Sequence, residues 1–211
     1  MKNSRKAKEK KDKKFNGTRE EFLIAATKIL NEKVFKPAGY PLELDKVKLT
    51  CGFPSVKGTG ARKRPIAECW PRCASDAGVN EIFISPLLKK ETAVLGTLTH
   101  ELVHAYDDCK NSHNKTFAKI ANAVGLVGKP TECGCEDGTP LHEEIERIVA
   151  TIGVYPHATL NVRGKKKQST RMLKVECECG FKVRLSRKAI DGICETNFCC
   201  WHCGDTDLQI D

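Results

Sequence analysis

The sequence has few of the residues that build a large core by packing alone. Aromatic residues make up 6% of the 211-residue chain, with only two tryptophans and two methionines. No apolar run of about 15 to 20 residues occurs, and no apolar segment follows the basic N-terminus. The sequence therefore predicts neither a signal peptide nor a membrane span, and it favours a cytoplasmic protein.

Cysteine, by contrast, is abundant, with twelve in the chain. In a reducing compartment cysteines are more often free or bound to metal than joined in disulfides. Without a signal peptide, a disulfide-framework protein is excluded, and the spacing of the cysteines carries the information.

The net charge of +9 is concentrated at the two ends of the chain. Residues 1–14 carry +6 and residues 163–188 carry +8, which leaves −5 for the remainder. A basic segment is the usual electrostatic footprint of a polyanion partner such as nucleic acid. We expect residues 1–17 to be a disordered basic tail and the second basic segment to face nucleic acid.

Hydrophobic periodicity and turn signals predict a mixed α+β chain with two domains. Capping residues and apolar faces indicate helices over residues 18–30, 91–106 and 139–153, and a further helix that ends near Gly125. Strands are expected within residues 41–55, 81–86 and 171–186. Composition changes near residue 160, so we predict a core over 18–159 and a small β-rich domain over 160–211.

The stretch "LTHELVHA" places two histidines and a glutamate in the pattern HExxH. On a helix, His100 and His104 lie one turn apart on the same face, so both imidazoles can reach one ion. Glu101 lies beside them without binding the ion. This is the arrangement of zinc hydrolases, in which the glutamate is the general base. The sequence therefore predicts a catalytic Zn²⁺ site on this helix.

A catalytic zinc needs a third protein ligand, and several residues are candidates. His113 is preferred because it precedes the next apolar helix by a few residues. Asp107 or Asp108 is expected to orient one of the zinc ligands by a hydrogen bond without binding the zinc ion itself. The competing candidates for the third ligand are Asp108, Glu143, Glu144 and Glu146.

A second metal site is indicated by the C-terminal cysteines in "CECG" and "FCCWHCG". Two close pairs about 20 residues apart are typical of a structural zinc ribbon. The preferred ligands are Cys177, Cys179, Cys200 and Cys203, with Cys194, Cys199 and His202 as alternatives. The other close pairs, Cys69 with Cys73 and Cys133 with Cys135, have some of the character of metal ligands, and the preferred interpretation is that they are buried or free thiols.

Together, "CGFPS", "AECW", "EIFISP", "LTHELVHA", "HNKTFAKIANAVGL" and "ECECGFKVRLS" resemble the SprT-like zinc metalloprotease family, related to Spartan, in its compact bacteriophage form. The resemblance spans residues 18–204. It implies a zincin-like core of helices packed on a small sheet, followed by a basic zinc ribbon. It also implies zinc ligation by His100, His104 and His113, with Glu101 as general base.

The resemblance further implies an endopeptidase that acts on DNA-associated proteins, as in DNA–protein crosslink repair, with a preference for single-stranded DNA and, if phage-encoded, a location in the host cytoplasm. The strand "EIFISP" would be the edge that pairs with substrate. The alternative is a non-catalytic zinc-containing DNA-binding protein. Stacking candidates are Phe181, Phe198 and Trp201, and phosphate contacts are expected from Lys165, Lys166, Lys167, Arg171, Lys182, Arg184, Arg187 and Lys188.

Overall fold

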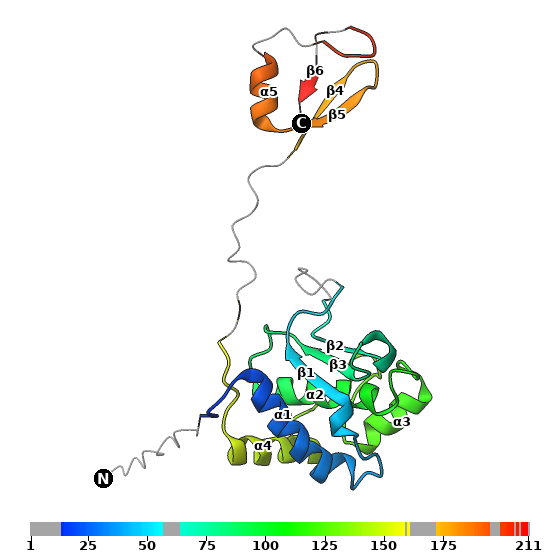
Figure 1. Cartoon of the computed structure of the whole chain (residues 1–211), viewed down its shortest axis with the longest axis vertical. Coiled ribbons are helices and arrows are strands. Elements are labelled where there is room, and N and C mark those ends of the chain that lie inside the picture. Colours follow the sequence, from blue (N-terminus) through cyan, green and yellow to red (C-terminus); the bar gives the residue numbers. More distant parts are fainter. Residues whose placement is uncertain are drawn as a thin grey trace, which may run out of the picture. The chain divides into compact units, whose positions relative to one another are not determined.

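A computed structural model of the chain describes residues 14–56, 64–158, 160, 172–194, 199–204, 206 and 208–210. The chain divides into two units, Met1–Val162 and Arg163–Asp211, each of which can be followed in Figure 1. The predicted tail over residues 1–17 lies mostly outside the described residues, as do residues 161–171 around the predicted domain boundary. Both assignments remain predictions.

The larger unit contains a three-stranded sheet in the order β1-β3-β2. The strands are β1 (Val47–Cys51), β2 (Ala67–Trp70) and β3 (Asn80–Ile84). β3 is paired with β1 in parallel and with β2 in antiparallel orientation. The prediction that the "EIFISP" segment forms a free edge is therefore wrong, because hydrogen bonds to β1 and β2 occupy both of its sides. β2 is an edge strand instead.

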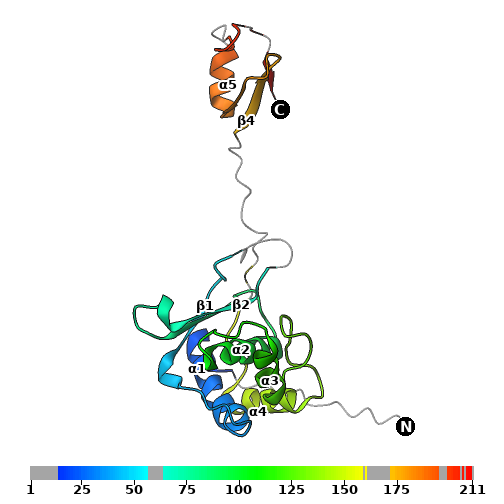
Figure 2. The same ribbon diagram turned by 90° about the vertical axis from the view of Figure 1, so that its right-hand side faces the viewer.

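Four helices lie on one side of this sheet, as Figure 2 shows. They are α1 (Arg19–Leu30), α2 (Glu91–Tyr106), α3 (Lys115–Ala123) and α4 (Pro140–Ile152). All four were predicted from the sequence, and the expected caps are present. The Thr18 hydroxyl accepts a hydrogen bond from the backbone amide of Glu21, and the Glu21 carboxylate accepts one from the backbone amide of Thr18. The Thr139 side chain caps α4.

The core of the larger unit is formed where these helices meet the buried face of the sheet. Ile82 and Ile84 of β3 point into it, and α2 is buried on nearly all sides. A helix enclosed in this way is held at fixed height and rotation by its neighbours. Any polar group on α2 therefore has a well-defined position.

The smaller unit contains a second sheet, in the order β5-β4-β6, with both pairs antiparallel. Its elements are β4 (Leu173–Cys177), β5 (Lys182–Leu185), α5 (Arg187–Cys194) and β6 (Leu208–Ile210). The expected alternation along β5 is present, with exposed basic and half-buried apolar side chains. Helix α5 was not predicted. The chain as a whole is mixed α+β, and among the described residues no helix is long and apolar enough to cross a membrane.

Candidate metal centre

Helix α2 brings the two motif histidines together inside the larger unit. The His100 and His104 ring centroids are 5.1 Å apart, and each residue is only 9% exposed. Glu101 is 7% exposed. Burial of three ionisable side chains on one helix is costly unless they are paired or bind a ligand. This cluster is therefore the strongest candidate for a functional site in the described residues.

The third histidine comes from the turn between α2 and α3. The His113 Nε2 atom lies 3.2 Å from His100 Nε2 and 3.1 Å from His104 Nε2. One ligand atom from each ring lies within 4.8 Å of the other two. His113 precedes the helix rather than sharing its inward face, because Asn114 is the N-cap of α3 and accepts hydrogen bonds from the amides of Thr116 and Phe117.

An aromatic ring packs against all three imidazoles. Phe117 of α3 is fully buried, and its ring centroid lies 5.0 Å from that of His100, 4.4 Å from that of His104 and 5.0 Å from that of His113. The contact with His104 is a stack. Packing against a fixed ring restricts the rotamers of all three histidines, so their converging orientation is largely preorganised.

The hydrogen-bond partner of His100 is one that the sequence analysis missed. His100 Nδ1 lies 3.2 Å from the Cys133 carbonyl oxygen and 3.2 Å from its Sγ. A proton on Nδ1 satisfies the carbonyl and leaves Nε2 free to bind a metal. The predicted role of Asp107 or Asp108 is wrong. In the part of the chain described, Asp108 accepts from Arg72 N and Asn80 Nδ2, and neither Asp107 carboxylate oxygen has a hydrogen-bond partner.

Gly96 allows the loop that carries Cys133 to approach α2. A Cβ at this position would lie 2.8 Å from the Cys135 Cβ and 3.0 Å from its backbone nitrogen. Cβ atoms in proteins essentially never lie as close as 2.8 Å to another heavy atom, so a larger residue would displace the loop and with it the partner of His100.

We therefore expect Gly96→Ala to destabilise the larger unit by about 1 to 2 kcal/mol, although alanine in a helix normally gains about 1 kcal/mol over glycine. Urea unfolding measures the change. Gly192→Ala in α5 is the matched control, because a Cβ there meets nothing within 4 Å, and it should stabilise its own unit. A rise in stability for both variants would contradict the close approach at Gly96.

Burial keeps the histidines neutral. It lowers the pKa of His100 to about 4 and that of His104 to about 3, with a further contribution in each case from the neighbouring histidines. Burial also lowers the pKa of His113. Neutral imidazoles are the form that binds a metal ion, and three protein ligands are the usual number at a catalytic zinc. The donor set is thus compatible with zinc.

Glu101 lies next to the histidines in a different electrostatic state. Burial raises the pKa of its carboxyl group to about 8, and the negative charge of Glu68 adds to the effect. A carboxyl group whose pKa lies near neutrality can both take and return a proton, which is the requirement for general acid–base catalysis.

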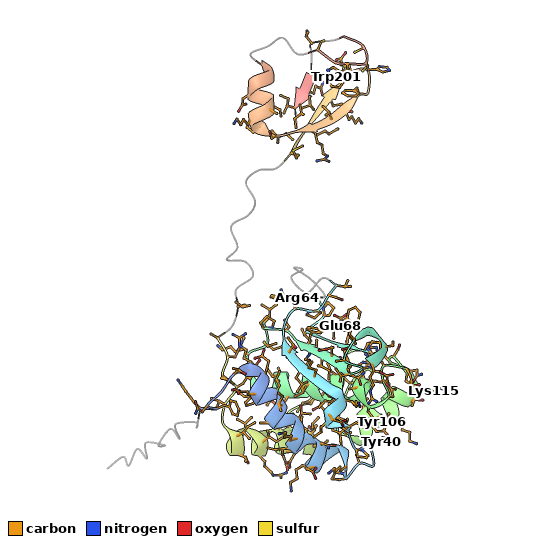
Figure 3. All side chains as sticks on the ribbon, viewed as in Figure 1. Tyr40, Arg64, Glu68, Tyr106, Lys115 and Trp201 are labelled. Atoms are coloured by element: carbon orange, nitrogen blue, oxygen red, sulfur yellow. The ribbon has the colours of Figure 1, made fainter. Side chains whose placement is uncertain are left out.

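The cluster opens into a cavity of about 670 Å³. His100, Glu101, His104 and His113 form one wall, and residues of β2 form another. Glu68, labelled with Arg64 in Figure 3, lines the cavity and accepts hydrogen bonds from Ser55 N at 2.7 Å and Ser55 Oγ at 2.8 Å. The edge strand and the histidines therefore border the same space.

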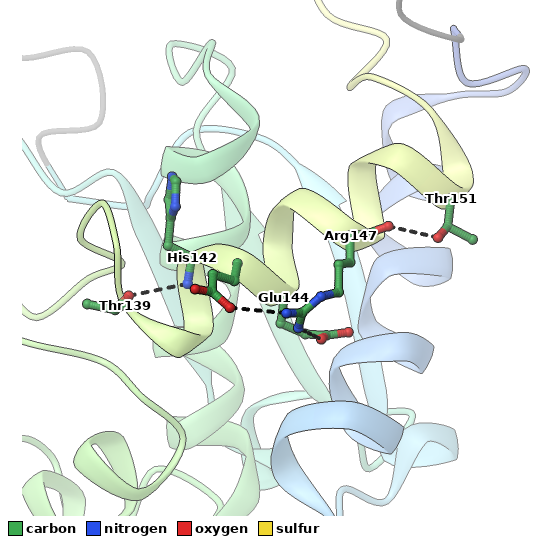
Figure 4. A network of polar contacts seen from close by, with 6 residues as sticks. Thr139, His142, Glu144, Arg147 and Thr151 are labelled. Atoms are coloured by element: carbon green, nitrogen blue, oxygen red, sulfur yellow. Dashed lines mark hydrogen bonds and ion pairs between the residues drawn. The ribbon is translucent and has the colours of Figure 1, made fainter.

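The other candidates for the third ligand lie elsewhere. Asp108 is paired with Arg72 and Asn80, as described above. Glu143 and Glu144 form ion pairs with Arg147 on α4, at 3.1 and 2.8 Å, and Figure 4 shows this network. Glu146 is exposed on the same helix. Of the candidates considered, the structure thus brings only His113 to His100 and His104.

A second cluster forms in the smaller unit from the four preferred cysteines. Cys177 Sγ lies 3.5 Å from Cys203 Sγ, and Cys179 Sγ lies 3.6 Å from Cys200 Sγ. One sulfur from each lies within 4.8 Å of the others. Four thiolates at this separation are compatible with a tetrahedral zinc ion. Cys199 and His202 are not part of the group, and the side chain of Cys194 lies outside the description.

The basic residues of the smaller unit differ in how free their charges are. Lys182 Nζ lies 2.6 Å from the Glu176 carboxylate, which also pairs with Lys174. Among the described residues, no ion pair involves the remaining three predicted contacts, Arg184, Arg187 and Lys188. The predicted contacts Lys165, Lys166, Lys167 and Arg171, and the stacking candidate Phe198, lie outside the described residues.

Comparison with known proteins identified no relative. No family model matches the sequence, no curated protein matches it, and no solved structure matches the chain. A functional assignment therefore depends on the geometry of the two clusters and the cavity.

Proposed function

We propose that this protein is a zinc-dependent endopeptidase of the SprT-like kind, with a zincin-like core and a zinc ribbon. The observation that carries the proposal is the convergence of three imidazole nitrogens on a cavity that also contains the buried carboxyl group of Glu101. A metal that only stabilised the fold would need neither an open cavity nor an ionisable carboxyl group beside its ligands.

In this proposal each residue has a separate task. His100, His104 and His113 hold the zinc ion, which supplies Lewis-acid chemistry that activates water and a carbonyl group for hydrolysis. Glu101 accepts the proton of the attacking water and transfers it to the leaving amine. The Cys133 carbonyl keeps His100 in the tautomer whose Nε2 faces the cavity.

Strand β2 provides a surface for a polypeptide substrate. It is paired on one side with β3, and no other strand in the described part of the chain pairs with its second side. Its residues Ala67, Glu68 and Cys69 line the cavity. An extended substrate can add to such an edge through main-chain hydrogen bonds, which is a recognition mode with little dependence on sequence. We propose that β2, and not β3, aligns the scissile bond with Glu101.

The smaller unit would then hold the enzyme on DNA. Its four-cysteine cluster is suited to a structural zinc ion, and Arg184, Arg187 and Lys188 carry positive charge that the described residues leave unpaired. Trp201, labelled in Figure 3, is 86% exposed. An exposed indole in a unit that also carries such basic residues is suited to stacking on an unpaired base, which favours single-stranded DNA.

The peptidase assignment is tested with zinc-loaded full-length protein and an unfolded protein substrate such as casein. We expect cleavage that a zinc chelator abolishes and added Zn²⁺ restores, because the three histidines provide no catalysis without the metal. Peptide products are measured by mass spectrometry. Absence of cleavage by the zinc-loaded protein, with and without single-stranded DNA, would contradict the proposal.

The DNA-binding assignment predicts a weaker and less salt-dependent affinity when three charges are removed. Replacing Arg184, Arg187 and Lys188 with glutamine should reduce the slope of log K against log salt by about 2, at about 0.7 per phosphate contact on a single strand. Fluorescence anisotropy of a labelled oligonucleotide measures it. Lys182→Gln is the matched control and should change little, because Glu176 already pairs with that charge.

A further inference from the structure

Two cysteines outside both metal clusters lie side by side in the wall of the cavity. Cys69 is in β2, and Cys109 is in the turn between α2 and α3. Their sulfurs are 3.5 Å apart, and Cys109 Sγ is also 3.5 Å from the Cys69 carbonyl oxygen. Both residues are partly exposed and line the cavity, so a small reagent can reach them.

Polar contacts hold the two segments at this distance. Asp108, next to Cys109, accepts hydrogen bonds from Arg72 N at 2.8 Å and Asn80 Nδ2 at 3.1 Å. Asn80 Nδ2 also donates to the Trp70 carbonyl at 3.2 Å. The turn is thereby attached to the end of β2 and the start of β3, and the proximity of the thiols is a property of the framework rather than of two side-chain rotamers.

We propose that Cys69 and Cys109 form a reversible dithiol–disulfide pair that is oxidised by a low-molecular-weight disulfide such as oxidised glutathione. The Cys109 thiolate attacks one sulfur of the glutathione disulfide and releases one glutathione thiolate. The Cys69 thiolate then attacks the Cys109 sulfur of this mixed disulfide and releases the second. The cysteines lose two electrons and two protons, and glutathione gains them.

The two sulfurs are placed for this exchange by geometry, because both line the cavity and lie in contact with each other. The chemistry is the same whichever of the two thiolates attacks first. Formation of the disulfide bond requires the distance between the two sulfurs to fall from 3.5 Å to about 2 Å. Small displacements of the turn and of the edge strand together provide this approach.

The disulfide would fasten the strand that borders the cavity to the turn that carries His113. An extended chain could then not displace the turn from the Cys69 carbonyl oxygen, which Cys109 Sγ contacts at 3.5 Å, and cleavage would slow. This consequence depends on the proposed peptidase function, whereas formation of the disulfide does not.

The test uses zinc-loaded full-length protein equilibrated in glutathione buffers of increasing oxidised fraction, then acid-quenched, alkylated and digested with trypsin. The tryptic peptides 64–72 and 91–110 contain one cysteine each, so a cross-link between them identifies the pair. We expect this cross-linked species to be about 2 Da lighter than the two reduced peptides together and to disappear in reduced glutathione. Cys73→Ser, which removes an exposed cysteine nearby, should retain the cross-link.

The functional readout is the cleavage rate in the same buffers. We expect a loss of at least fivefold in the oxidised wild-type protein, full recovery on reduction, and no response in Cys109→Ser, whose fold is checked by circular dichroism. Glutathione adducts without the 64–72 to 91–110 cross-link would overturn the proposal, and a cross-link that leaves cleavage unchanged would overturn its regulatory part. If no cleavage occurs under any condition, the cross-link still decides the assignment of the pair.

Discussion

Replacing Glu101 with glutamine is expected to lower kcat/KM for peptide cleavage by about 10³-fold while leaving the zinc content unchanged. An amide of the same shape fills the same space but cannot accept a proton, and general base catalysis contributes about 10² to 10⁴. Stability should be equal or higher, because burial of Glu101 already disfavours its charged form. Steady-state kinetics, metal analysis and a melting curve measure the three quantities.

Glu132→Gln is the control for this experiment, since Glu132 is an exposed carboxylate that lines the same cavity. It should retain activity to within a few fold. If Glu101→Gln cleaves as fast as the wild type, Glu101 is not the general base. The alternative of a non-catalytic DNA-binding protein gains support instead if neither protein cleaves the substrate, provided that the charge-removal variant of the smaller unit still loses affinity for DNA.

The second large effect concerns the number of metal ions. We expect two zinc ions per chain in the wild-type protein and one in His104→Ala, because two remaining imidazoles bind zinc far more weakly than three. Inductively coupled plasma mass spectrometry of the desalted protein gives the ratio of zinc to protein. His142→Ala is the matched control. His142 lies on α4, 3.2 Å from the Asp137 carboxylate, and its replacement should leave both zinc ions in place.

A reciprocal variant identifies the ion that remains. Cys177→Ser combined with Cys200→Ser should remove the ion of the smaller unit and leave that of the three histidines, since the two clusters share no ligand. Two zinc ions in His104→Ala would exclude the histidine cluster as a zinc site and, with it, the proposed hydrolysis.

The part of the site that depends on local geometry could be predicted from the sequence. The separation of His100 and His104 by four residues places them on one face of any helix, and the apolar residues around them predict that helix. The structure brings together the same pair that the pattern predicts. The cysteine cluster of the smaller unit could also be predicted, because two close cysteine pairs at this separation are a recognised pattern for tetrahedral zinc binding.

What the sequence could not predict depends on contacts between distant residues. The turn that delivers His113 contains three residues with positive φ, Asp108, Cys109 and Ser112, and none of them is a glycine that would mark such a turn. The position of Cys133 beside His100 depends on the close approach at Gly96, which has no signature in the sequence. The order of strands in the sheet also depends on contacts between residues far apart in the sequence. For this reason the prediction that β3 is an edge strand was wrong.

The side of β2 that pairs with no other described strand also has a cost for a protein at high concentration. Unpaired main-chain groups on a sheet edge can template the pairing of one copy with another and so start aggregation. Here the strand has only four residues, Pro65 and Pro71 flank it, and Glu68 puts a charge in its middle. Short length, flanking prolines and a charge are the features that keep such edges from joining copies into fibres. In the proposed function, the same four residues would thus accept an extended substrate chain briefly without recruiting another molecule of their own kind.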